Sequence, residues 1–532
     1  GTGTCCFGHP EDCFLAPCDL RLICFFLHRM STAVVWFRKC LRLHDNPSLV
    51  QVCDDESIQN ILPIHILDPA IVGKDFEKLS HNRIRFLFES LVDLDNKIKS
   101  ISNNSILVFH GTPQDVVRSL SNGCTGKLKS FSADYCSEPH GRKVSTEISN
   151  FLGKESDTVC HFHPATHTIL DLEKTVSQPG FKNPKSMKDI EKIFGSTFPK
   201  DDQGFFQIPN SLPEPSTFKP SPPGFQKDIL SKDFNGEIYS ITSLQRKFSE
   251  LGFLENKEEN SYFKGGESVA LDRLTRKVSS RTDYVNSFRK PKTASTNLPA
   301  NALEPSTTGL SPYITIGSLS VRRLWEEVEK ANRQGPHSAP PESLHGQLLF
   351  REMFYLLSLA VPNWDNDLEN SMCKRIDWGE TNEPILAQWS EGKTGFPFID
   401  ALMRQLDTTG WMHHLGRHAV SCFLTRGQLW QHWKHGRDVF DHKLLDGDWA
   451  LNNANWLWLS GVAPFSMPYF RLYNPCPDGK SSLNVDAVEA NFIRHWVPEL
   501  KNFPVKYIYE PHLAPLSVQE EAGCIIGQHY PN

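Results

Sequence analysis

The segment WMHHLGRHAVSCFLTRGQLWQHW, residues 411–433, gathers side chains that can move protons and electrons. It contains four histidines, two arginines and three tryptophans among apolar residues at helical spacing. His414 and His418 lie four residues apart and so share one helix face, from which they could donate protons to a ligand near neutral pH. The alternative is a pair of core histidines bonded to backbone groups, and the sequence leaves both interpretations open.

A zinc site is a further interpretation of two histidines at this spacing. The residues between them are Leu415, Gly416 and Arg417, so no glutamate base is present and a cationic arginine would oppose a metal ion. The 14 cysteines of the chain include no CxxC pair. We therefore predict no metal site.

Two other segments carry groups that could recognise a charged ligand. A buried Arg417 would need a carboxylate partner, and DGDWALNNANW offers Asp446 and Asp448. Upstream, EPSTTGLSPY places Thr307, Thr308 and Ser311 around a glycine, and such hydroxyl and N–H groups at a helix start can cradle an anion. The alternatives are a structural ion pair and an ordinary helix N-cap.

Tryptophans recur through the same part of the chain. Trp430 and Trp433 are spaced to touch on one helix, Trp456 and Trp458 follow in an apolar segment, and Trp378 precedes the next helix. A buried indole N–H must be satisfied, so leucine or isoleucine would fill a core more simply. A chain of indoles suggests a route for electrons, whereas aromatic packing is the better explanation for any single tryptophan.

Short β-branched runs and a helical pattern alternate over residues 33–165, which precede these motifs. AVVWF, ILPIHIL and ILVFH are typical of buried strands, and RIRFLFESLVDLDNKIKSI has the apolar spacing of a helix. This alternation predicts a doubly wound parallel α/β domain. No GxGxxG motif supports a dinucleotide site at the sheet edge.

Composition divides the remainder of the chain. Residues 1–32 are interpreted as an extension outside the fold, because the apolar run LICFFL is too short for the alternative, a signal peptide. Residues 166–265 are rich in Pro, Ser, Lys and Asp and predict a long linker that wraps a surface between two domains. From residue 266 to 532 helical periodicity dominates, which predicts an all-α domain.

Charge and hydropathy restrict the class of protein. The net charge of −6 differs from the strongly positive charge typical of nucleic-acid-binding proteins. The basic segment LTRKVSSRTDYVNSFRKPK could still lie along a phosphate backbone, or it could form a solvated helix face. The sequence contains no run of 18 apolar residues, so we predict no membrane span. Scattered cysteines suit reduced thiols, so we expect the nucleus, the cytoplasm or both.

Taken together, the motifs resemble the photolyase/cryptochrome flavoproteins over residues 33–528. VVWFRKCLRLHDNPSL is similar to the family's opening strand and loop. LSPYITIGSLS, GKTGFPFIDALMRQLDTTGWMHHLGRHAV and DGDWALNNANWLWLS are similar to its flavin-domain motifs, in the correct order. HHLGRHAVSCFLTRG, EPSTTGLSPY and VKYIYEPHLAP most resemble animal (6-4) photolyases and light-responsive animal cryptochromes.

The resemblance implies a FAD cofactor in the helical domain and assigns its contacts. An antenna chromophore, deazaflavin or folate, is also possible in the N-terminal domain. Asn452 matches the position facing flavin N5, where the side chain tunes which flavin state survives. The implied FAD-binding residues are Thr307, Thr308, Leu310 and Ser311 at the pyrophosphate, Gln347, Arg351 and His414 in the cavity, the pair Arg417 and Asp446, then Asp448 and Asn452.

The resemblance also implies an electron-transfer chain. Trp456, Trp433 and Trp378 match the family's tryptophan triad, and Trp430 stands where some animal members add a fourth aromatic residue. Light absorbed by oxidised FAD would draw an electron from Trp456, and the hole would move outward through Trp433 to Trp378 or Trp430.

Two functions follow from this resemblance. A cryptochrome, the preferred interpretation, would use blue light to change its conformation, its oligomeric state or its contact with a clock or signalling partner. A (6-4) photolyase would instead flip a lesion of UV-damaged DNA into the cavity and repair it by electron transfer from reduced FAD, with His414 and His418 as proton donors. LLFREMF places Phe350 where a lesion-side tryptophan is expected, and an extra residue occurs near Tyr473.

A light-independent transcriptional regulator is the third possibility. The complete set of tryptophans makes it the least favoured, because such a protein needs no electron route.

Overall fold

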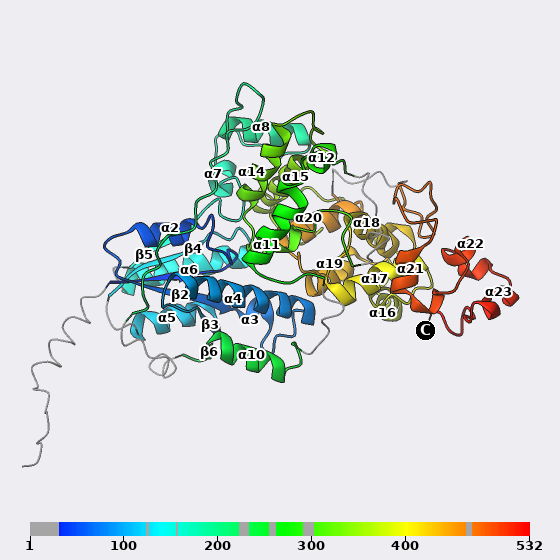
Figure 1. Cartoon of the computed structure of the whole chain (residues 1–532), viewed down its shortest axis with the longest axis horizontal. Helices are drawn as coiled ribbons and strands as arrows, with labels where there is room; N and C mark the ends of the chain where they lie inside the picture. The colour runs from blue at the N-terminus through cyan, green and yellow to red at the C-terminus, as the bar shows by residue number, and fades with distance from the viewer. Residues whose placement is uncertain are drawn as a thin grey trace, which may run out of the picture.

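The computed structural model describes residues 31–123, 127–155, 158–222, 234–254, 262–290, 303–463 and 471–531. A sheet domain and a helical domain lie side by side along the longest axis of the molecule (Figure 1). The predicted extension, residues 1–32, falls outside the described residues except for its last two, which already belong to the first strand. None of the described helices is both long and apolar enough to span a membrane.

The sheet domain contains a six-stranded sheet with the order β5-β4-β1-β2-β3-β6. Five strands pair in parallel, as predicted, and β6 pairs antiparallel to β3 at one edge. The strands are β1 (Ser31–Trp36), β2 (Asn60–Leu67), β3 (Leu107–His110), β4 (Lys127–Asp134), β5 (Val159–His163) and β6 (Glu237–Tyr239).

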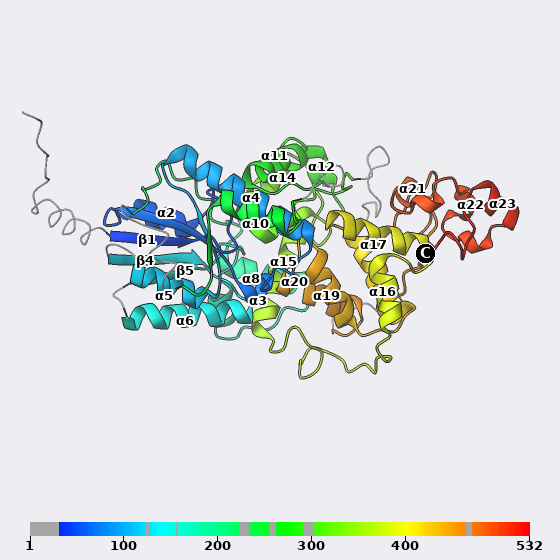
Figure 2. The same cartoon turned by 90° about the horizontal axis from the view of Figure 1, so that it is seen from below.

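Both faces of the sheet are covered by helices, as Figure 2 shows. Ala33 and Val35 of β1 join an apolar core with α4 and α10, while Val34 and Trp36 join a second core with α5 and α6. This alternation follows the two-residue period of a strand, so a central strand buried on both faces must be apolar throughout. The covering helices are α2 (Pro47–Asp54), α3 (Pro69–Val72), α4 (His81–Ile101), α5 (Pro113–Gly123), α6 (Pro139–Glu155) and α10 (Ile241–Glu250).

The segment predicted as a linker, residues 166–265, contains more structure than its composition indicates. It supplies β6 and α10 to the sheet domain, and α7 (Leu172–Val176) and α8 (Met187–Thr197) to the helical domain. Ile190 and Phe194 of α8 are fully buried, and Phe194 stacks on Trp325 with ring centroids 5.9 Å apart. Met187 and Ile193 pack against the same core, so α8 has apolar residues at helical spacing, but this single short run lies within a segment rich in Pro, Ser and Lys.

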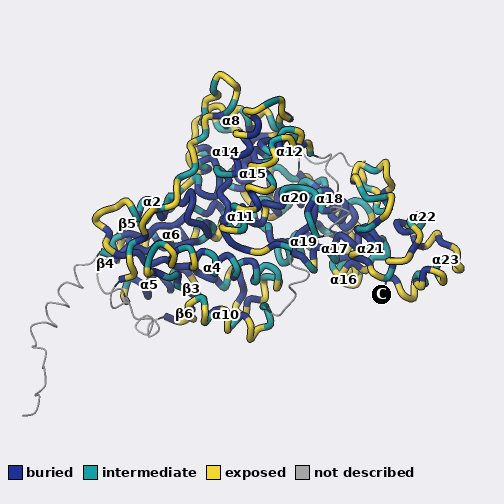
Figure 3. The backbone as a smooth tube through the Cα atoms, in the orientation of Figure 1, coloured by how far each residue is buried: buried dark blue, intermediate teal, exposed yellow. Residues whose placement is uncertain are grey.

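The helical domain is built around two apolar helices, α15 and α20, whose residues are mostly buried (Figure 3). From residue 266 onward the described residues contain no strand, in agreement with the prediction. The helices are α11 (Glu267–Leu274), α12 (Thr282–Ser287), α13 (Ser311–Ile316), α14 (Val321–Asn332), α15 (Leu344–Ala360), α16 (Glu383–Glu391), α17 (Pro397–Thr409), α18 (His414–Cys422), α19 (Trp433–Lys443), α20 (Trp449–Leu459), α21 (Asn491–Trp496), α22 (Val505–Ile508) and α23 (Leu516–Glu521).

The loop after β1, residues 37–46, joins the two domains and is called the domain clasp below. The fully buried carboxylate of Glu267 accepts the backbone N–H groups of Leu43 at 2.9 Å and His44 at 3.0 Å. It also contacts the His44 imidazole, and Lys97 Nζ lies 3.0 Å away. Burial by itself raises the pKa of Glu267, but these partners outweigh it and hold the pKa at about 2.

Two further charged contacts complete the domain clasp. The buried Arg42 donates from Nη1 to the carbonyl of Gly317 at 2.8 Å. The buried Asp45 accepts Arg322 Nη2 at 2.6 Å and also the hydroxyl of Ser320. Because every charge has a partner from the opposite domain or from backbone, separation of the domains would expose or orphan all of them.

Replacing Glu267 by Gln should weaken the domain clasp in a pH-dependent way. The carboxylate is more acidic in the folded chain, about 2 against about 4.5 unfolded, so it contributes roughly 3 kcal/mol above pH 4.5 that is lost as the pH falls toward 2. We expect a lower urea midpoint for Glu267→Gln at neutral pH and a smaller difference at about pH 3.

The matched control is Glu56→Gln, which changes an exposed glutamate of the same domain. Its urea midpoint should equal that of the wild type at both pH values. An equally stable Glu267→Gln protein at neutral pH would contradict the role assigned to the domain clasp.

Candidate functional site

A cavity of about 570 Å³ lies inside the helical domain. Its size falls within the range of sites for cofactors and other small ligands, and its wall combines apolar side chains with a few polar groups. The structure brings most of the predicted site residues to this wall although they come from four separate segments. Those that line it are Thr307, Thr308, Leu310, Ser311, Gln347, Arg351, His414, Arg417, His418, Asp446, Asn452 and Trp456.

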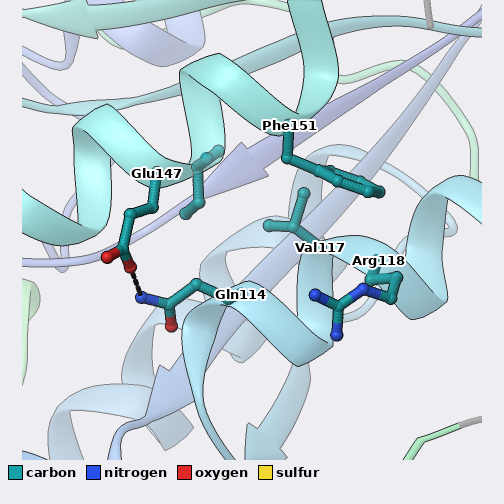
Figure 4. A pocket seen from close by; sticks show the side chains of 6 residues that line it. Gln114, Val117, Arg118, Glu147 and Phe151 are labelled. Atoms are coloured by element: carbon teal, nitrogen blue, oxygen red, sulfur yellow. Dashed lines mark hydrogen bonds between the residues drawn. The ribbon is translucent and has the colours of Figure 1, made fainter. Parts of the chain in front are cut away.

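A second, smaller groove of about 230 Å³ lies on the sheet domain between α5 and α6 (Figure 4). Val117 and Phe151 form its apolar floor, Gln114 donates to Glu147 across it, and the guanidinium of Arg118 lies 5.7 Å from the Phe151 ring centroid. It contains none of the predicted site residues. The helical-domain cavity is therefore the candidate functional site.

The glycine turn before α13 forms one wall of the cavity. Gly309 has a φ of +61°, a conformation that favours glycine, and a side chain there would meet the guanidinium of Arg273. Arg273 Nε donates to the carbonyl of Thr308 at 2.8 Å, and burial lowers the pKa of this guanidinium to about 10. A cation therefore lies directly behind the segment in which the sequence predicted an anion cradle.

Arg417 and Asp446 form the predicted ion pair, with Nη2 and Oδ2 2.8 Å apart. The hydroxyl of Ser311 donates to the same carboxylate oxygen at 2.7 Å, so this hydroxyl is already engaged rather than free for a phosphate. The other oxygen of Asp446, Oδ1, is buried without a hydrogen-bond partner among the described residues. An orphaned carboxylate oxygen at a cavity wall is a site for an N–H donor of a bound ligand.

Asp448, unlike the other predicted FAD-binding residues, does not line the cavity. It is the N-cap of α20, where Oδ1 accepts the N–H of Leu451 at 3.0 Å. Its Oδ2 accepts the hydroxyl of Tyr355 at 2.6 Å and lies 3.7 Å from Lys39 Nζ of the sheet domain. The side chain caps the helix that carries Asn452 and Trp456, which gives it a positioning role, and its contact with a flavin stays a prediction.

The two histidines face each other across the start of α18, with ring centroids 5.8 Å apart. His418 Nδ1 lies 2.9 Å from the hydroxyl of Tyr473, and His414 Nε2 has no partner among the described residues. Burial, followed by the nearby Lys290, lowers the pKa of both imidazoles, that of His418 to about 3. Both rings are therefore neutral at physiological pH unless an anion enters the cavity.

Lys290 was not identified from the sequence as a site residue. It lines the cavity beside Arg417, and burial together with this arginine lowers its pKa to about 8. The sequence drew attention to Tyr473 only because of an extra residue near it, yet its hydroxyl lies within hydrogen-bond distance of His418. Tyr473 thus lies at the cavity, which spacing along the chain could not indicate.

Four tryptophans and one histidine, called the aromatic path below, lie at the cavity wall and in a series of ring contacts that reaches the surface. Trp456 lines the cavity and packs on Gly436 of α19, where any side chain would collide with the indole. Trp433, also on α19, is fully buried and stacks on His432 at 5.8 Å. Trp378 lies 5.7 Å from His432 and 5.5 Å from Trp430, whose ring is 46% exposed.

The placement of Trp430 corrects one prediction and adds a residue. Trp430 and Trp433 do not share a helix, because α19 begins at Trp433 and Trp430 has a φ of +51° in the turn before it. That turn directs Trp430 against Trp378 instead. His432 was not predicted, and it lies between Trp433 and Trp378 as a third ring in the path.

One group of described residues has the spacing of a metal site, namely His44, Glu214 and Glu267. Only His44 belongs to the domain clasp, and the group is remote in sequence from His414 and His418. The ammonium of Lys97 lies 2.6 Å from Glu214 and 3.0 Å from Glu267, so a cation already neutralises both carboxylates. The prediction that the protein uses no metal stays a prediction.

Comparisons with known proteins agree with this architecture. A family described as the FAD binding domain of DNA photolyase matches residues 343–532, and one described as DNA photolyase matches residues 33–204. The chain is 39% identical to a (6-4)DNA photolyase of Arabidopsis thaliana, over 94% of this chain and 85% of that protein. It is 37% identical to Cryptochrome-1 of Sylvia borin, over 94% and 75% of the two chains.

Solved structures are similar in fold over nearly the whole chain. A Synechocystis cryptochrome superposes with a TM-score of 0.75 at 25% identity and covers 95% of this chain and 96% of its own. A class III photolyase from Agrobacterium tumefaciens gives a TM-score of 0.72 at 23% identity over 94% of each chain, which shows the fold alone.

FAD is the cofactor of the matched domain, and the cavity fits it in three respects. The volume suits a large ligand, Asp446 Oδ1 needs a donor, and Arg417, Lys290 and the buried Arg273 supply positive charge for a phosphate-bearing molecule. The antenna chromophore stays a prediction.

Replacing Asp446 by Ala should weaken FAD binding strongly. The change leaves Arg417, which is only 22% exposed, without its carboxylate and removes the acceptor of the Ser311 hydroxyl. A loss of about 3 kcal/mol corresponds to roughly 100-fold weaker binding, measured by reconstituting the apoprotein with FAD.

The control removes an exposed ion pair of the same domain. Asp407→Ala breaks the contact with Lys443, but the aspartate is 64% exposed and the affinity for FAD should not change. Wild-type affinity in Asp446→Ala would refute the assignment of this pair to the FAD site.

Proposed function

Because the chain belongs to the photolyase/cryptochrome family, we propose that it is a blue-light photoreceptor of the cryptochrome type. The observation that carries the proposal is the aromatic path, in which Trp456 at the cavity wall packs on α19 and ring contacts lead from Trp433 of that helix to the exposed Trp430. Bound FAD would supply absorption of blue light and one-electron chemistry. The protein would supply the electron, the exit of positive charge and the surface that responds.

Trp456 is placed to give up the first electron, because it is the indole of the path at the cavity wall. Trp433 can refill it from α19, the helix on which Trp456 packs through Gly436. His432 and Trp378 continue the path with centroid separations of 5.8 and 5.7 Å. Over such short ring separations the positive charge can move in both directions. It moves outward from Trp456 only if it is more stable on the outer rings.

The surroundings of the indole N–H groups supply that difference. Nε1 of Trp433 and of Trp378 are buried without partners among the described residues, so a positive ring there has no acceptor for its proton. Trp430 Nε1 donates to the carbonyl of Asp377 at 3.1 Å and its ring is 46% exposed. Water and this carbonyl stabilise a positive ring at Trp430, which supports outward movement of the charge.

The electrostatics of the histidines favour the photoreceptor over the repair enzyme. Repair of a (6-4) lesion would use His414 or His418 as a proton donor. Burial and Lys290 lower the pKa of both, so neither carries an extra proton at neutral pH. Phe350 at the cavity wall in place of the expected tryptophan also removes an indole on which a base could stack.

The second candidate is a (6-4) DNA photolyase, and a specific observation favours it. Lys290 and Arg471 both line the cavity, and neither has an ion-pair partner among the described residues. His418 and Tyr473 form a hydrogen-bonded pair beside Trp458, whose ring lies 5.4 Å from His418. A DNA phosphate at the cationic residues would raise the pKa of the histidines and restore an acid.

The proposal also includes partners and location. A light-dependent change would be transmitted to a second copy of the chain or to a clock or signalling protein. We place the protein in the nucleus, the cytoplasm or both, supported by the free thiols of all described cysteines.

Replacing Trp456 by Phe should slow or abolish photoreduction of bound FAD. Phenylalanine keeps an aromatic ring at the cavity wall but is far harder to oxidise. The measurement is the loss of the oxidised flavin absorption under blue light with an external reductant. Full photoreduction in this variant would rule out the proposed route.

Trp389→Phe is the matched control for this test. Trp389 is equally buried and lies 6.3 Å from Trp456, but its N–H is bonded to the carbonyl of Val420 and it is not on the path to Trp430. Its photoreduction should match the wild type, so a defect shared by both variants would indicate a packing effect.

A repair assay separates the two functions. Purified protein with its FAD chemically reduced is illuminated with an oligonucleotide that contains one (6-4) lesion. We expect no restoration of the bases while FAD stays bound and photoreducible, because His414 is neutral in this cavity. Light-dependent restoration would establish the photolyase instead.

A further inference from the structure

The amide of Asn452 is held from the side opposite the cavity by two acceptors. Its Nδ2 donates to Asp441 Oδ1 at 2.5 Å and to the carbonyl of Arg437 at 3.1 Å. Both acceptors belong to α19, whereas Asn452 belongs to α20 and lines the cavity. The two helices that carry the aromatic path are therefore also joined through this amide.

These bonds determine which end of the amide is available to the cavity. An amide NH₂ has two N–H donors, and Asp441 and Arg437 accept both. A half-turn of the amide would set Oδ1 against a carboxylate and a carbonyl, both of them acceptors. The carbonyl oxygen of Asn452 is thus the polar atom left for a ligand.

Charged groups of α19 itself and of α4 surround Asp441. Arg437 and Asp438 lie beside it on α19, with Arg437 Nε 3.9 Å from Asp441 Oδ2. Arg83 of α4, in the sheet domain, donates to the backbone carbonyls of Asp441 and Gly447. The carboxylate is thus flanked by two guanidinium groups, one from each domain.

The ionisation state of Asp441 agrees with its role as an acceptor. Burial raises its pKa, Asn452, Arg83 and Arg437 lower it, Asp438 raises it again, and the outcome is about 6. This pKa lies below neutral pH, and the side chain keeps 40% of its surface exposed to water. Asp441 is therefore ionised at neutral pH and accepts rather than donates.

We propose that Asp441 is a positioning residue that fixes the Asn452 amide with its carbonyl oxygen toward the FAD cavity and thereby favours the reduced cofactor. Reduction adds an N–H donor to the flavin ring system, and an acceptor at the cavity wall binds that form better than the oxidised form, which lacks the donor. The inference rests on the proposed function, because it assigns the cavity to redox-active FAD.

The test is a dark redox titration of the holoprotein, which requires no light and no substrate. Asp441→Leu has nearly the same side-chain shape but no acceptor, so the Asn452 amide is free to rotate. We expect the equilibrium between reduced and oxidised FAD to shift about tenfold toward the oxidised form, equivalent to a midpoint about 30 mV lower for a two-electron couple.

Two variants separate positioning from general effects. Asp441→Asn keeps an acceptor oxygen at the same position and should retain the wild-type midpoint. Asp438→Leu removes a carboxylate from the adjacent position of α19, where the side chain is 65% exposed, and should also leave the midpoint unchanged. Equal shifts in Asp438→Leu and Asp441→Leu would overturn the proposal in favour of a simple charge effect.

The remaining outcomes also decide the question. A wild-type midpoint in Asp441→Leu with FAD fully bound would refute the proposal. A midpoint in Asp441→Asn that is as low as the one expected for Asp441→Leu would also refute it. If Asp441→Leu does not retain FAD, Asp441→Ala is titrated in its place with the same expectation. Failure of wild-type photoreduction would refute the photoreceptor alone, since the dark titration does not depend on it.

Discussion

The ion pair of Arg417 and Asp446 is the contact on which the geometry of the site depends. It joins α18 to the turn before α20, and Ser311 adds the start of α13 to the same carboxylate oxygen. Three segments that are far apart in the chain thus meet at one charged group. Since Asp446 is nearly buried and Arg417 is 22% exposed, neither charge can be satisfied by water alone, so the pair holds the cavity wall together.

A second set of charges ties this cavity to the sheet domain. Glu267 binds the backbone of the domain clasp, while Arg83 of α4 reaches the carbonyls of Asp441 and Gly447 at the turn before α20. Lys39, which follows β1, lies 3.7 Å from the N-cap Asp448. The same turn therefore serves the cofactor on one side and the domain interface on the other, so a change in either can reach the other through a few bonds.

In the proposed photoreceptor, the histidines and the tryptophans occupy different electrostatic surroundings. The imidazoles of His414 and His418 are neutral because burial and Lys290 disfavour their charged forms. The tryptophans of the aromatic path end at the exposed Trp430, whose N–H has an acceptor. A cavity that disfavours positive charge inside and stabilises it outside suits a light-driven redox protein, and an anionic ligand would be needed to turn it into an acid catalyst.

The sequence alone determined the two-domain architecture, the FAD-domain motifs and the identities of the tryptophans, because strand alternation, helical periodicity and motif spacing are local properties of a chain. The polar composition of residues 166–265 concealed α8, whose helical pattern of apolar residues extends over only 11 residues. Only the tertiary structure showed that Asp448 caps a helix, that Trp430 contacts Trp378, and that His432 and Lys290 belong with the site. Ring contacts, imidazole protonation and the orientation of the Asn452 amide depend on neighbours from distant segments, and only folding brings those neighbours together.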